Sequence, residues 1–218
     1  MRTELGLADG RVSVVPQGPV FYEQTGIDRT EARRHLDMDS NAVVFLMMGV
    51  IRPYKGLDTA LRAFANLVRN QPDSRLLIAG NPLDVRYLRE LQELSASLKL
   101  ESFIDWHLGY VPSEAVGLFH AASDVALFPY KAISQSAAFL TAAALGICVL
   151  GTNVGGIGEV VADGKTGLLM ETAEHADVVS GMRRALALTR EQREHLGQAL
   201  RAQVLSEFSW ARIAARTV

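Results

Sequence analysis

Residues 43–56 of the chain read VVFLMMGVIRPYKG, an apolar run followed by a basic loop between two glycines. Such a run, without polar alternation, is typical of a parallel strand that helices cover on both faces. The next residues predict an amphipathic helix, because apolar side chains recur at helical spacing: Leu57, Leu61, Phe64, Leu67 and Val68. This stretch therefore predicts the strand, turn and helix that open a doubly wound sheet.

The same alternation of apolar runs and amphipathic segments continues along the chain. Strands are expected at Val43–Met48, Arg75–Ala79, Phe103–Leu108, Val125–Pro129, Ile147–Leu150 and Thr166–Met170. After residue 170 the pattern is purely helical, with helices expected over 173–188, over 191–206 and from about Ser209. The sequence thus predicts an α/β fold, a doubly wound parallel sheet of about six strands with a C-terminal helical tail. Ligands of such sheets bind beyond the carboxyl ends of the strands.

Composition excludes several classes of protein. The 218 residues carry 22 Lys and Arg against 24 Asp and Glu, and this net charge of −2 gives no general attraction to nucleic acid. No apolar run approaches the ~20 residues of a transmembrane helix, and the first residues lack the apolar core of a signal peptide. Because Cys148 is the only cysteine, no internal disulfide can form, and we expect a cytoplasmic protein.

The loop after the first strand is a candidate anion site. Gly49 lets a ligand approach the backbone, and Gly56 opens a helix whose free N–H groups favour an anion. Arg52 offers a planar fork for phosphate oxygens and Lys55 a compact charge. The alternative is that both cations are solvated loop residues. The loop does not have the pattern of a Walker phosphate-binding loop.

Two later loops carry polar or glycine-rich segments. Ser134, Gln135 and Ser136 stand where a helix begins after an apolar strand, so they either cap that helix or face a ligand. Gly155 and Gly156 belong to a glycine-rich turn that leads into a short helix expected at Glu159–Ala162. This turn either lines a small pocket with backbone amides or is only a tight connection.

The chain shows no pattern of a metal site or of a hydrolase. Its five histidines have no metal-ligand spacing, and Asp37-Met38-Asp39 lies between a helix and the first strand rather than after a strand. Cys148 lies within an expected strand, where thiols are usually packed and inert. No Gly-x-Ser-x-Gly turn occurs. We therefore expect neither a metal nor another cofactor.

Five segments together resemble a known family: GVIRPYKG (49–56), the turn Gly80-Asn81, FIDWHLGYVPSEAV (103–116), LFPY (127–130) and ALGICVLGTNVGGIGEVVADGKTGLL (144–169). They resemble the donor-binding half of group 1 (family 4) glycosyltransferases. The resemblance implies the two-domain GT-B fold, whose C-terminal Rossmann-like domain holds a nucleotide-activated sugar. An N-terminal domain holds the acceptor, and no metal is required.

The resemblance also implies roles for individual residues. Lys55 matches the lysine that contacts the donor diphosphate, and Arg52 matches an arginine of the I-R-P-Y-K-G version of this loop. The loop 109–111, which is Gly109, Tyr110 and Val111, would approach the nucleotide base. Gly155, Gly156 and Glu159 match the G-G-x-x-E pattern that follows the donor loop.

The chain departs from the family at the Glu-x7-Glu motif. Its two glutamates would stand at positions 133 and 141, where this sequence has Ile133 and Thr141. Thr141 can replace only part of the ribose contact that a carboxylate makes. The run Ser134-Gln135-Ser136 resembles a Q-S-G-like loop found in one branch, which would give sugar or phosphate contacts to Gln135 and Ser136.

The resemblance divides the chain and suggests its activity. Residues 1–40 would form a connecting segment with a strand and a helix, and residues 41–218 the donor-binding domain, with the N-terminal acceptor domain absent. The expected enzyme is a retaining glycosyltransferase that moves a hexose from a UDP- or GDP-sugar to a glycan or lipid-linked acceptor. The chain alone would be inactive, and the full enzyme could lie at the inner membrane surface.

Three other classes of protein are alternatives to this assignment. A degenerate non-catalytic module for nucleotide binding or assembly stays open, because both motif glutamates are replaced. A nucleotide-sugar epimerase would need acid and base side chains, of which the sequence shows no convincing set. A receiver domain would need acidic residues at the end of the first strand, where this chain has Met47-Met48-Gly49.

Overall fold

The computed structural model describes residues 15, 17–19 and 26–215. In this part of the chain six strands form one parallel sheet, in the order β3-β2-β1-β4-β5-β6. The strands are β1 (Val43–Met48), β2 (Ser74–Gly80), β3 (Ile104–Leu108), β4 (Val125–Phe128), β5 (Cys148–Thr152) and β6 (Leu168–Met170). This order is that of the Rossmann fold, so the predicted fold class is confirmed, and each predicted strand matches one strand within a few residues.

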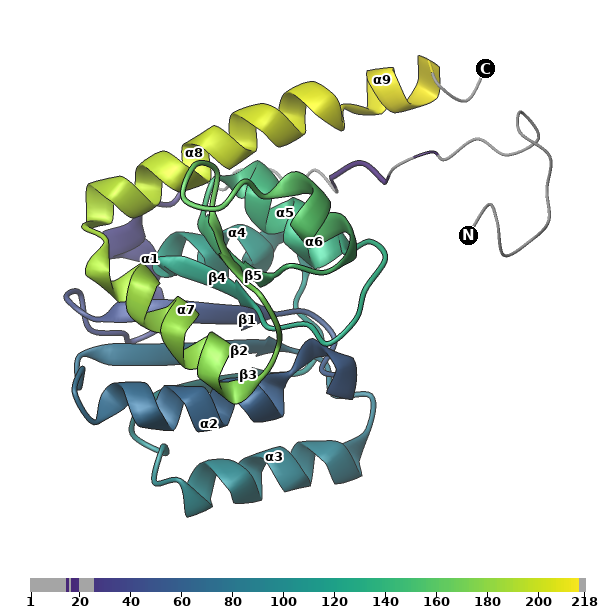
Figure 1. Cartoon of the computed structure of the whole chain (residues 1–218). Coiled ribbons are helices and arrows are strands. Elements are labelled where there is room, and N and C mark those ends of the chain that lie inside the picture. Colours follow the sequence, from purple (N-terminus) through teal and green to yellow (C-terminus); the bar gives the residue numbers. More distant parts are fainter. Residues whose placement is uncertain (1–14, 16, 20–25, 216–218) are drawn as a thin grey trace, which may run out of the picture.

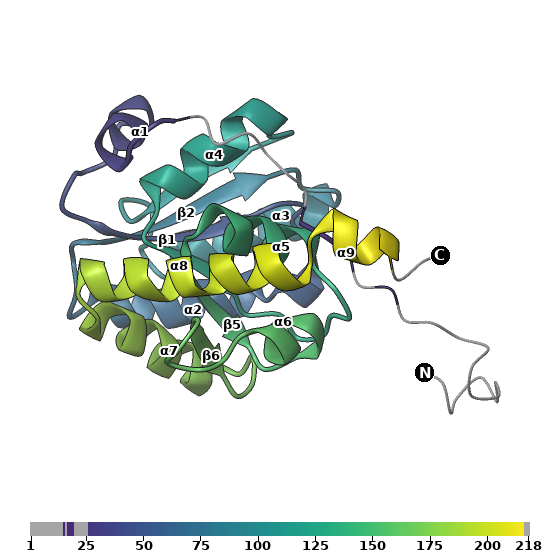
Figure 2. The ribbon, with the colours of Figure 1, turned by 90° about the horizontal axis from the view of Figure 1, so that it is seen from above.

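Helices cover both faces of the sheet (Figure 1). One face carries α2 (Leu57–Val68), α3 (Val85–Ser97) and α7 (His175–Ala187). The other carries α1 (Arg29–His35), α4 (Ser113–Ala122), α5 (Ala137–Leu145) and α8 (Arg190–Glu207). The short elements are η1 (Pro53–Lys55), α6 (Gly155–Val160) and α9 (Trp210–Ala215). Figure 2 shows α8 lying across the molecule and leading into α9, so the predicted helical tail is confirmed.

Apolar side chains explain why the strands are buried on both sides. Phe45, Leu76 and Leu127 point to the layer of α2 and α7, while their chain neighbours Leu46, Leu77 and Phe128 point to the layer of α4, α5 and α8. All six side chains are 3% exposed or less. A strand that alternates between two apolar layers reads as a continuous apolar run, which is the pattern of the sequence.

The connecting segment is only partly described. The expected helix is α1, and the Asp28 carboxylate caps it by accepting a hydrogen bond from the Glu31 amide at 2.8 Å. The strand expected within residues 1–40 is not seen at residues 15, 17–19 and 26–40, and the remaining positions lie outside the described residues.

A buried ion pair fixes α1 to the amino end of the sheet. The Arg33 side chain, 1% exposed, donates to the Asp124 carboxylate at 2.7 Å and to the carbonyl oxygens of Ala122 and Ala42. Asp124 also accepts a hydrogen bond from the Val44 amide at 2.8 Å. One carboxylate therefore joins α1, β1 and the start of β4.

Removing this carboxylate should destabilise the fold severely. We expect Asp124→Ala to lower the free energy of unfolding by about 3–5 kcal/mol, because it leaves a buried, uncompensated guanidinium. The measurement is urea unfolding followed by circular dichroism. Glu90→Ala is the control, since its exposed pair with Arg86 contributes less than about 1 kcal/mol. A similar loss in both variants would contradict the structural role given to Asp124.

Candidate functional site

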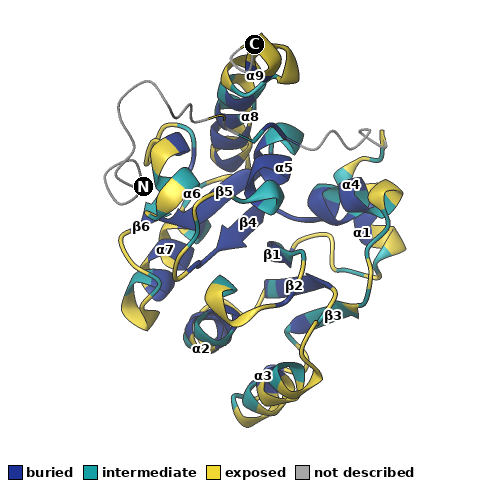
Figure 3. Cartoon of the chain, turned by 90° about the vertical axis from the view of Figure 1, so that its right-hand side faces the viewer, coloured by how far each residue is buried: buried dark blue, intermediate teal, exposed yellow. Residues whose placement is uncertain are grey.

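The carboxyl ends of the parallel strands meet at one edge of the sheet, which Figure 3 views end-on. The loops that follow β1, β2, β3, β4 and β5 all emerge there. At this edge β1 and β4 lie side by side, but α2 leaves β1 toward one face and α5 leaves β4 toward the other. A sheet whose strand order reverses in this way opens a crevice between the two loops, where doubly wound proteins bind their ligands.

Glycines bring the loops after β1 and β2 into direct backbone contact. Gly49 has φ of +107° and Gly80 has φ of +155°, and a Cβ on Gly80 would overlap the Gly49 carbonyl oxygen. The Gly49 amide donates to Ala79 and the Ile51 amide to Asn81, at 2.9 and 3.0 Å. The basic loop is therefore an ordered extension of the sheet.

Gly56 joins the same loop to the loop after β4. It has φ of +69°, and a Cβ there would overlap the carbonyl oxygen of Pro129. The Lys131 amide donates to the Tyr54 carbonyl at 2.8 Å, and the Lys131 ammonium pairs with Asp58 at 3.0 Å. The two sides of the crevice are thus held together.

Lys55 lies in this crevice with a half-buried side chain. Its Nζ is 5.6 Å from the ring centroid of Tyr130 and 3.0 Å from the position that a Cβ on Gly49 would take. Within the described residues no carboxylate pairs with it. Burial, and then repulsion from Arg52, lowers the pKa of Lys55 from 10.5 to about 8. An ammonium that is partly desolvated and unpaired is costly by itself and favours a bound anion.

A small pocket beside Lys55 brings three of the predicted residues together. Gly49, Arg52 and Lys55 all line it, over apolar side chains of β1, β2 and β4. Arg52 is exposed and also has no carboxylate partner in the described chain. Gly56, the N-cap residue of α2, provides no side-chain cap, so the N-terminus of this helix is available to an anion.

Four other predicted residues line a second pocket of about 290 Å³. They are Gln135, Ser136, Gly156 and Glu159. The Ser136 hydroxyl caps α5 by accepting from the Phe139 amide at 3.2 Å, and Gln135 Oε1 accepts from the Gln17 amide at 3.0 Å. Helix capping by Ser136 is therefore confirmed, and ligand contact remains a prediction.

The short helix after β5 begins earlier than expected. The structure places α6 at Gly155–Val160, so the expected range Glu159–Ala162 is wrong and Glu159 lies in the last turn. Gly155, with φ of +46°, packs on the Ile133 carbonyl, and the Gly156 amide donates to the carbonyl of Ser134 at 2.9 Å. These contacts with the loop after β4 start the helix at the glycines themselves.

The loop after β3 reaches the same edge. The Gly109 amide donates to the Gly80 carbonyl at 3.0 Å, and Tyr110 is 81% exposed. Val111 packs against the core on the α4 side. Thr141, by contrast, is 5% exposed within α5 and lines neither of the two pockets described above.

Tyr130 was not among the predicted site residues, although it lines the pocket of Lys55. Its ring makes edge-to-face contacts with Tyr54 at 5.7 Å and Phe128 at 5.5 Å. The sequence points to Tyr130 only through its position just after an expected strand, in LFPY. A residue of the apolar core could occupy the same position, so this does not mark Tyr130 as a site residue.

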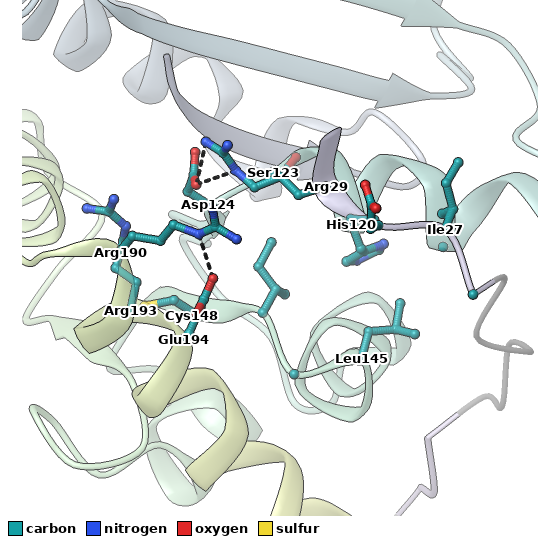
Figure 4. Close-up of a pocket in the computed structure, with 16 residues that line it drawn as sticks. Ile27, Arg29, His120, Ser123, Asp124, Leu145, Cys148, Arg190, Arg193 and Glu194 are labelled. Atoms are coloured by element: carbon teal, nitrogen blue, oxygen red, sulfur yellow. Dashed lines mark hydrogen bonds and ion pairs between the residues drawn. The ribbon is translucent and has the colours of Figure 1, made fainter. Parts of the chain in front are cut away.

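A larger cavity of about 430 Å³ lies at the opposite, amino edge of the sheet (Figure 4). Each of its arginines has a partner: Arg29 pairs with Asp124 at 3.3 Å, Arg190 pairs with Glu194 at 2.7 Å, and Nη1 of Arg193 donates to carbonyl oxygens at the end of α7, while its buried Nε has no hydrogen-bond partner. None of the predicted site residues lines it. The size of this cavity therefore does not make it the functional site.

No helix within the described residues is long and apolar enough to cross a membrane. No group of three or more His, Cys, Asp or Glu side chains in the same part of the chain is placed to hold a metal ion.

Comparison with known proteins gives glycosyl transferases. The family model described as "Glycosyl transferases group 1" matches residues 28–203. A D-inositol 3-phosphate glycosyltransferase of Geodermatophilus obscurus is 34% identical over 208 residues, which are 93% of this chain and 45% of that protein. The chain thus spans about half the length of the curated relatives it matches.

Solved structures agree on the fold. WaaG, a glycosyltransferase involved in lipopolysaccharide biosynthesis, superposes with a TM-score of 0.83 and 22% identity, over all of this chain and 59% of WaaG. HepE of Anabaena, solved with UDP and glucose, gives a TM-score of 0.73 at 20% identity, over 85% of this chain and 49% of HepE. Since the family model covers most of the chain and the fold agrees with it, the chain belongs to the group 1 glycosyl transferases.

Proposed function

We propose that this chain is the donor-binding half of a glycosyltransferase and binds a nucleotide-activated hexose, a UDP- or GDP-sugar, at the carboxyl edge of its sheet. The observation that carries the proposal is the Lys55 ammonium, half-buried at the crevice between β1 and β4 with no carboxylate partner among the described residues. A diphosphate would supply the missing negative charge. It would also meet Arg52 and the uncapped N-terminus of α2.

These cations would also perform the chemistry. When the sugar leaves its nucleotide, negative charge develops on the diphosphate oxygens, and fixed positive charge at that point lowers the barrier. Arg52 would hold two oxygens with its fork, and Lys55 would neutralise the charge that the bond cleavage adds. No protein nucleophile, metal or other cofactor is needed for this role, and we propose that transfer retains the anomeric configuration.

The other predicted residues would hold the two ends of the donor. Gly109, Tyr110 and Val111 would approach the base. The loop of Ser134, Gln135 and Ser136 with Gly155, Gly156 and Glu159 would approach the sugar. Thr141, buried within α5, is left out of this proposal, so the ribose contact expected of it is withdrawn. UDP and glucose in the HepE complex support a uridine nucleotide and a hexose as the first ligands to test.

We propose that the acceptor, a glycan or a lipid-linked sugar, is held by the remaining part of a longer protein. The relatives are about twice as long as this chain, and the names of two of them concern inositol phosphate and lipopolysaccharide. A second candidate function is a degenerate nucleotide-binding or assembly module. The replacement of both motif glutamates by Ile133 and Thr141 favours it.

Nucleotide binding tests the proposal directly. Calorimetric titration of the chain with UDP, GDP and ADP should show binding of at least one, and Lys55→Ala should weaken it by about 10–100-fold, the loss of one charge-assisted contact. Lys165→Ala removes the same charge from an exposed loop and should leave affinity unchanged. A folded chain that binds none of the three nucleotides would favour the degenerate module.

The affinity should depend on pH through Lys55. Because its pKa in the free chain is about 8, the protonated form that attracts a diphosphate disappears above that pH. UDP affinity should fall by up to about tenfold per pH unit above pH 8. The profile of Lys55→Ala should be flat there, apart from titration of the nucleotide itself, and parallel profiles in both proteins would refute the assignment.

Metal independence and the need for a second domain are tested together. UDP binding should be the same with excess EDTA as with Mg²⁺, and the chain supplied with donor and mixed acceptors should form no glycosylated product. Binding that requires Mg²⁺ would refute the metal-free role of Arg52 and Lys55. Transfer by the chain alone would refute its assignment as a half-site.

The unpaired ammonium should cost folding stability. A pKa lowered from 10.5 to about 8 means that folding with a charged Lys55 costs on the order of 1–3 kcal/mol at neutral pH. Lys55→Met, which keeps an apolar stem, should therefore raise stability at pH 7. Between pH 8 and 10.5 the unfolded wild type holds a proton that the folded chain has released. Wild-type stability then rises with pH, and the advantage of the variant should disappear; Lys165→Met should show no such trend in urea unfolding.

A further inference from the structure

The ring of Tyr130 forms one wall of the space that the Lys55 ammonium occupies. Tyr130 is 1% exposed, and Nζ of Lys55 lies 5.6 Å from its ring centroid. Nζ also comes so close to Gly49 that a Cβ there would lie only 3.0 Å away. The ammonium therefore lies close to both an aromatic ring and a glycine.

The ring itself cannot move freely. It packs edge-to-face against Tyr54 at 5.7 Å and Phe128 at 5.5 Å, and Phe128 packs in turn against Phe139 of α5 at 6.0 Å. The Tyr130 carbonyl oxygen accepts a hydrogen bond from the Thr152 hydroxyl of β5 at 2.7 Å. A chain of four rings thus runs from the loop after β1 into the core under the loop after β4.

No other contact in the described chain holds the ammonium in place. Arg52 is the charged group that faces it and repels it, while Asp58 on α2 is paired with Lys131. The face of an aromatic ring attracts a cation, and more strongly where the cation is partly desolvated. The ring is thus the attractive partner that the structure offers to Lys55.

We propose that Tyr130 is a positioning residue, whose ring fixes the Lys55 ammonium over Gly49 at the place where the diphosphate of a nucleotide sugar binds. The effect of Tyr130 on ligand binding rests on the proposed function. The placement of the Lys55 ammonium does not, because it is a property of the free chain. This role assigns a site function to a buried tyrosine that would otherwise be only a core residue. The phenolic hydroxyl is not needed for it.

The free chain gives the first test, which needs no ligand. The chain has four lysines, so the ε-CH₂ signals of ¹³C-labelled lysine can be assigned with Lys55→Gln and titrated by NMR. The Lys55 midpoint should stay near 8 in Tyr130→Phe, which keeps the ring. In Tyr130→Leu it should rise by a pH unit or more as the ammonium moves into solvent. A midpoint that stays near 8 or falls in Tyr130→Leu would overturn the proposal.

Phe139→Leu is the matched control for the loss of a core ring. It removes a ring from the same aromatic chain, two contacts away from Tyr130, and this ring does not line the Lys55 pocket. Its Lys55 midpoint should be that of the wild type. An equal shift in Phe139→Leu would mean that general loosening of the core moves the lysine, which would also overturn the proposal.

Binding of UDP or GDP gives the second test. Tyr130→Leu should weaken binding about tenfold and Tyr130→Phe less than threefold, while Tyr130→Leu added to Lys55→Ala should cause no further loss. Additive losses would overturn the positioning role. If the wild type binds neither nucleotide while the NMR midpoints behave as expected, the proposed function fails and the placement of Lys55 by Tyr130 stands.

Discussion

The pairing of β1 with β4 joins the two halves of the sheet, because the strand order reverses there. At the amino end Asp124 holds the pair by accepting hydrogen bonds from the Val44 amide and from Arg33. At the carboxyl end Gly56 packs directly on the Pro129 carbonyl. The first contact anchors α1, and the second closes the loop that carries Arg52 and Lys55. The crevice of the candidate site is therefore a consequence of how these two strands are joined.

The cations at the two edges of the sheet differ in whether they have partners. At the amino edge the cations that line the larger cavity are matched by carboxylates or by carbonyl oxygens. At the carboxyl edge Lys55 and Arg52 repel each other, and the described residues provide no carboxylate for either. Paired charges stabilise the fold. A cation without a partner remains able to attract an anionic ligand, and more strongly where it is partly desolvated. This contrast, rather than cavity volume, is why we propose the carboxyl edge as the ligand-binding edge.

Lys55 links folding stability with the proposed binding of an anion. A charged lysine whose pKa is lowered by burial lowers the free energy of unfolding. Such a loss of stability is typical of sites that act on a charged ligand. The Tyr130 ring and the Gly49 backbone restrict where the Lys55 ammonium can lie, and this limits the free-energy cost of binding. A preorganised cation spends little further free energy when the anion arrives. In this proposal the packed aromatic rings fix Tyr130, and Tyr130 in turn positions the Lys55 ammonium.

The amino-acid pattern was enough to predict the sheet and the basic loop. Apolar runs, most of them continuous, predicted the strands, and Gly49, Arg52 and Lys55 were recognisable because they follow the first strand within a short loop. Tertiary structure decided what depends on segments far apart in the chain. It buried Thr141 within α5, began α6 at Gly155 through contact with residues 133–134, and set Tyr130 of one loop beside Lys55 of another. Local pattern reports which residues are apolar or charged, but only the packed fold decides which of them meet.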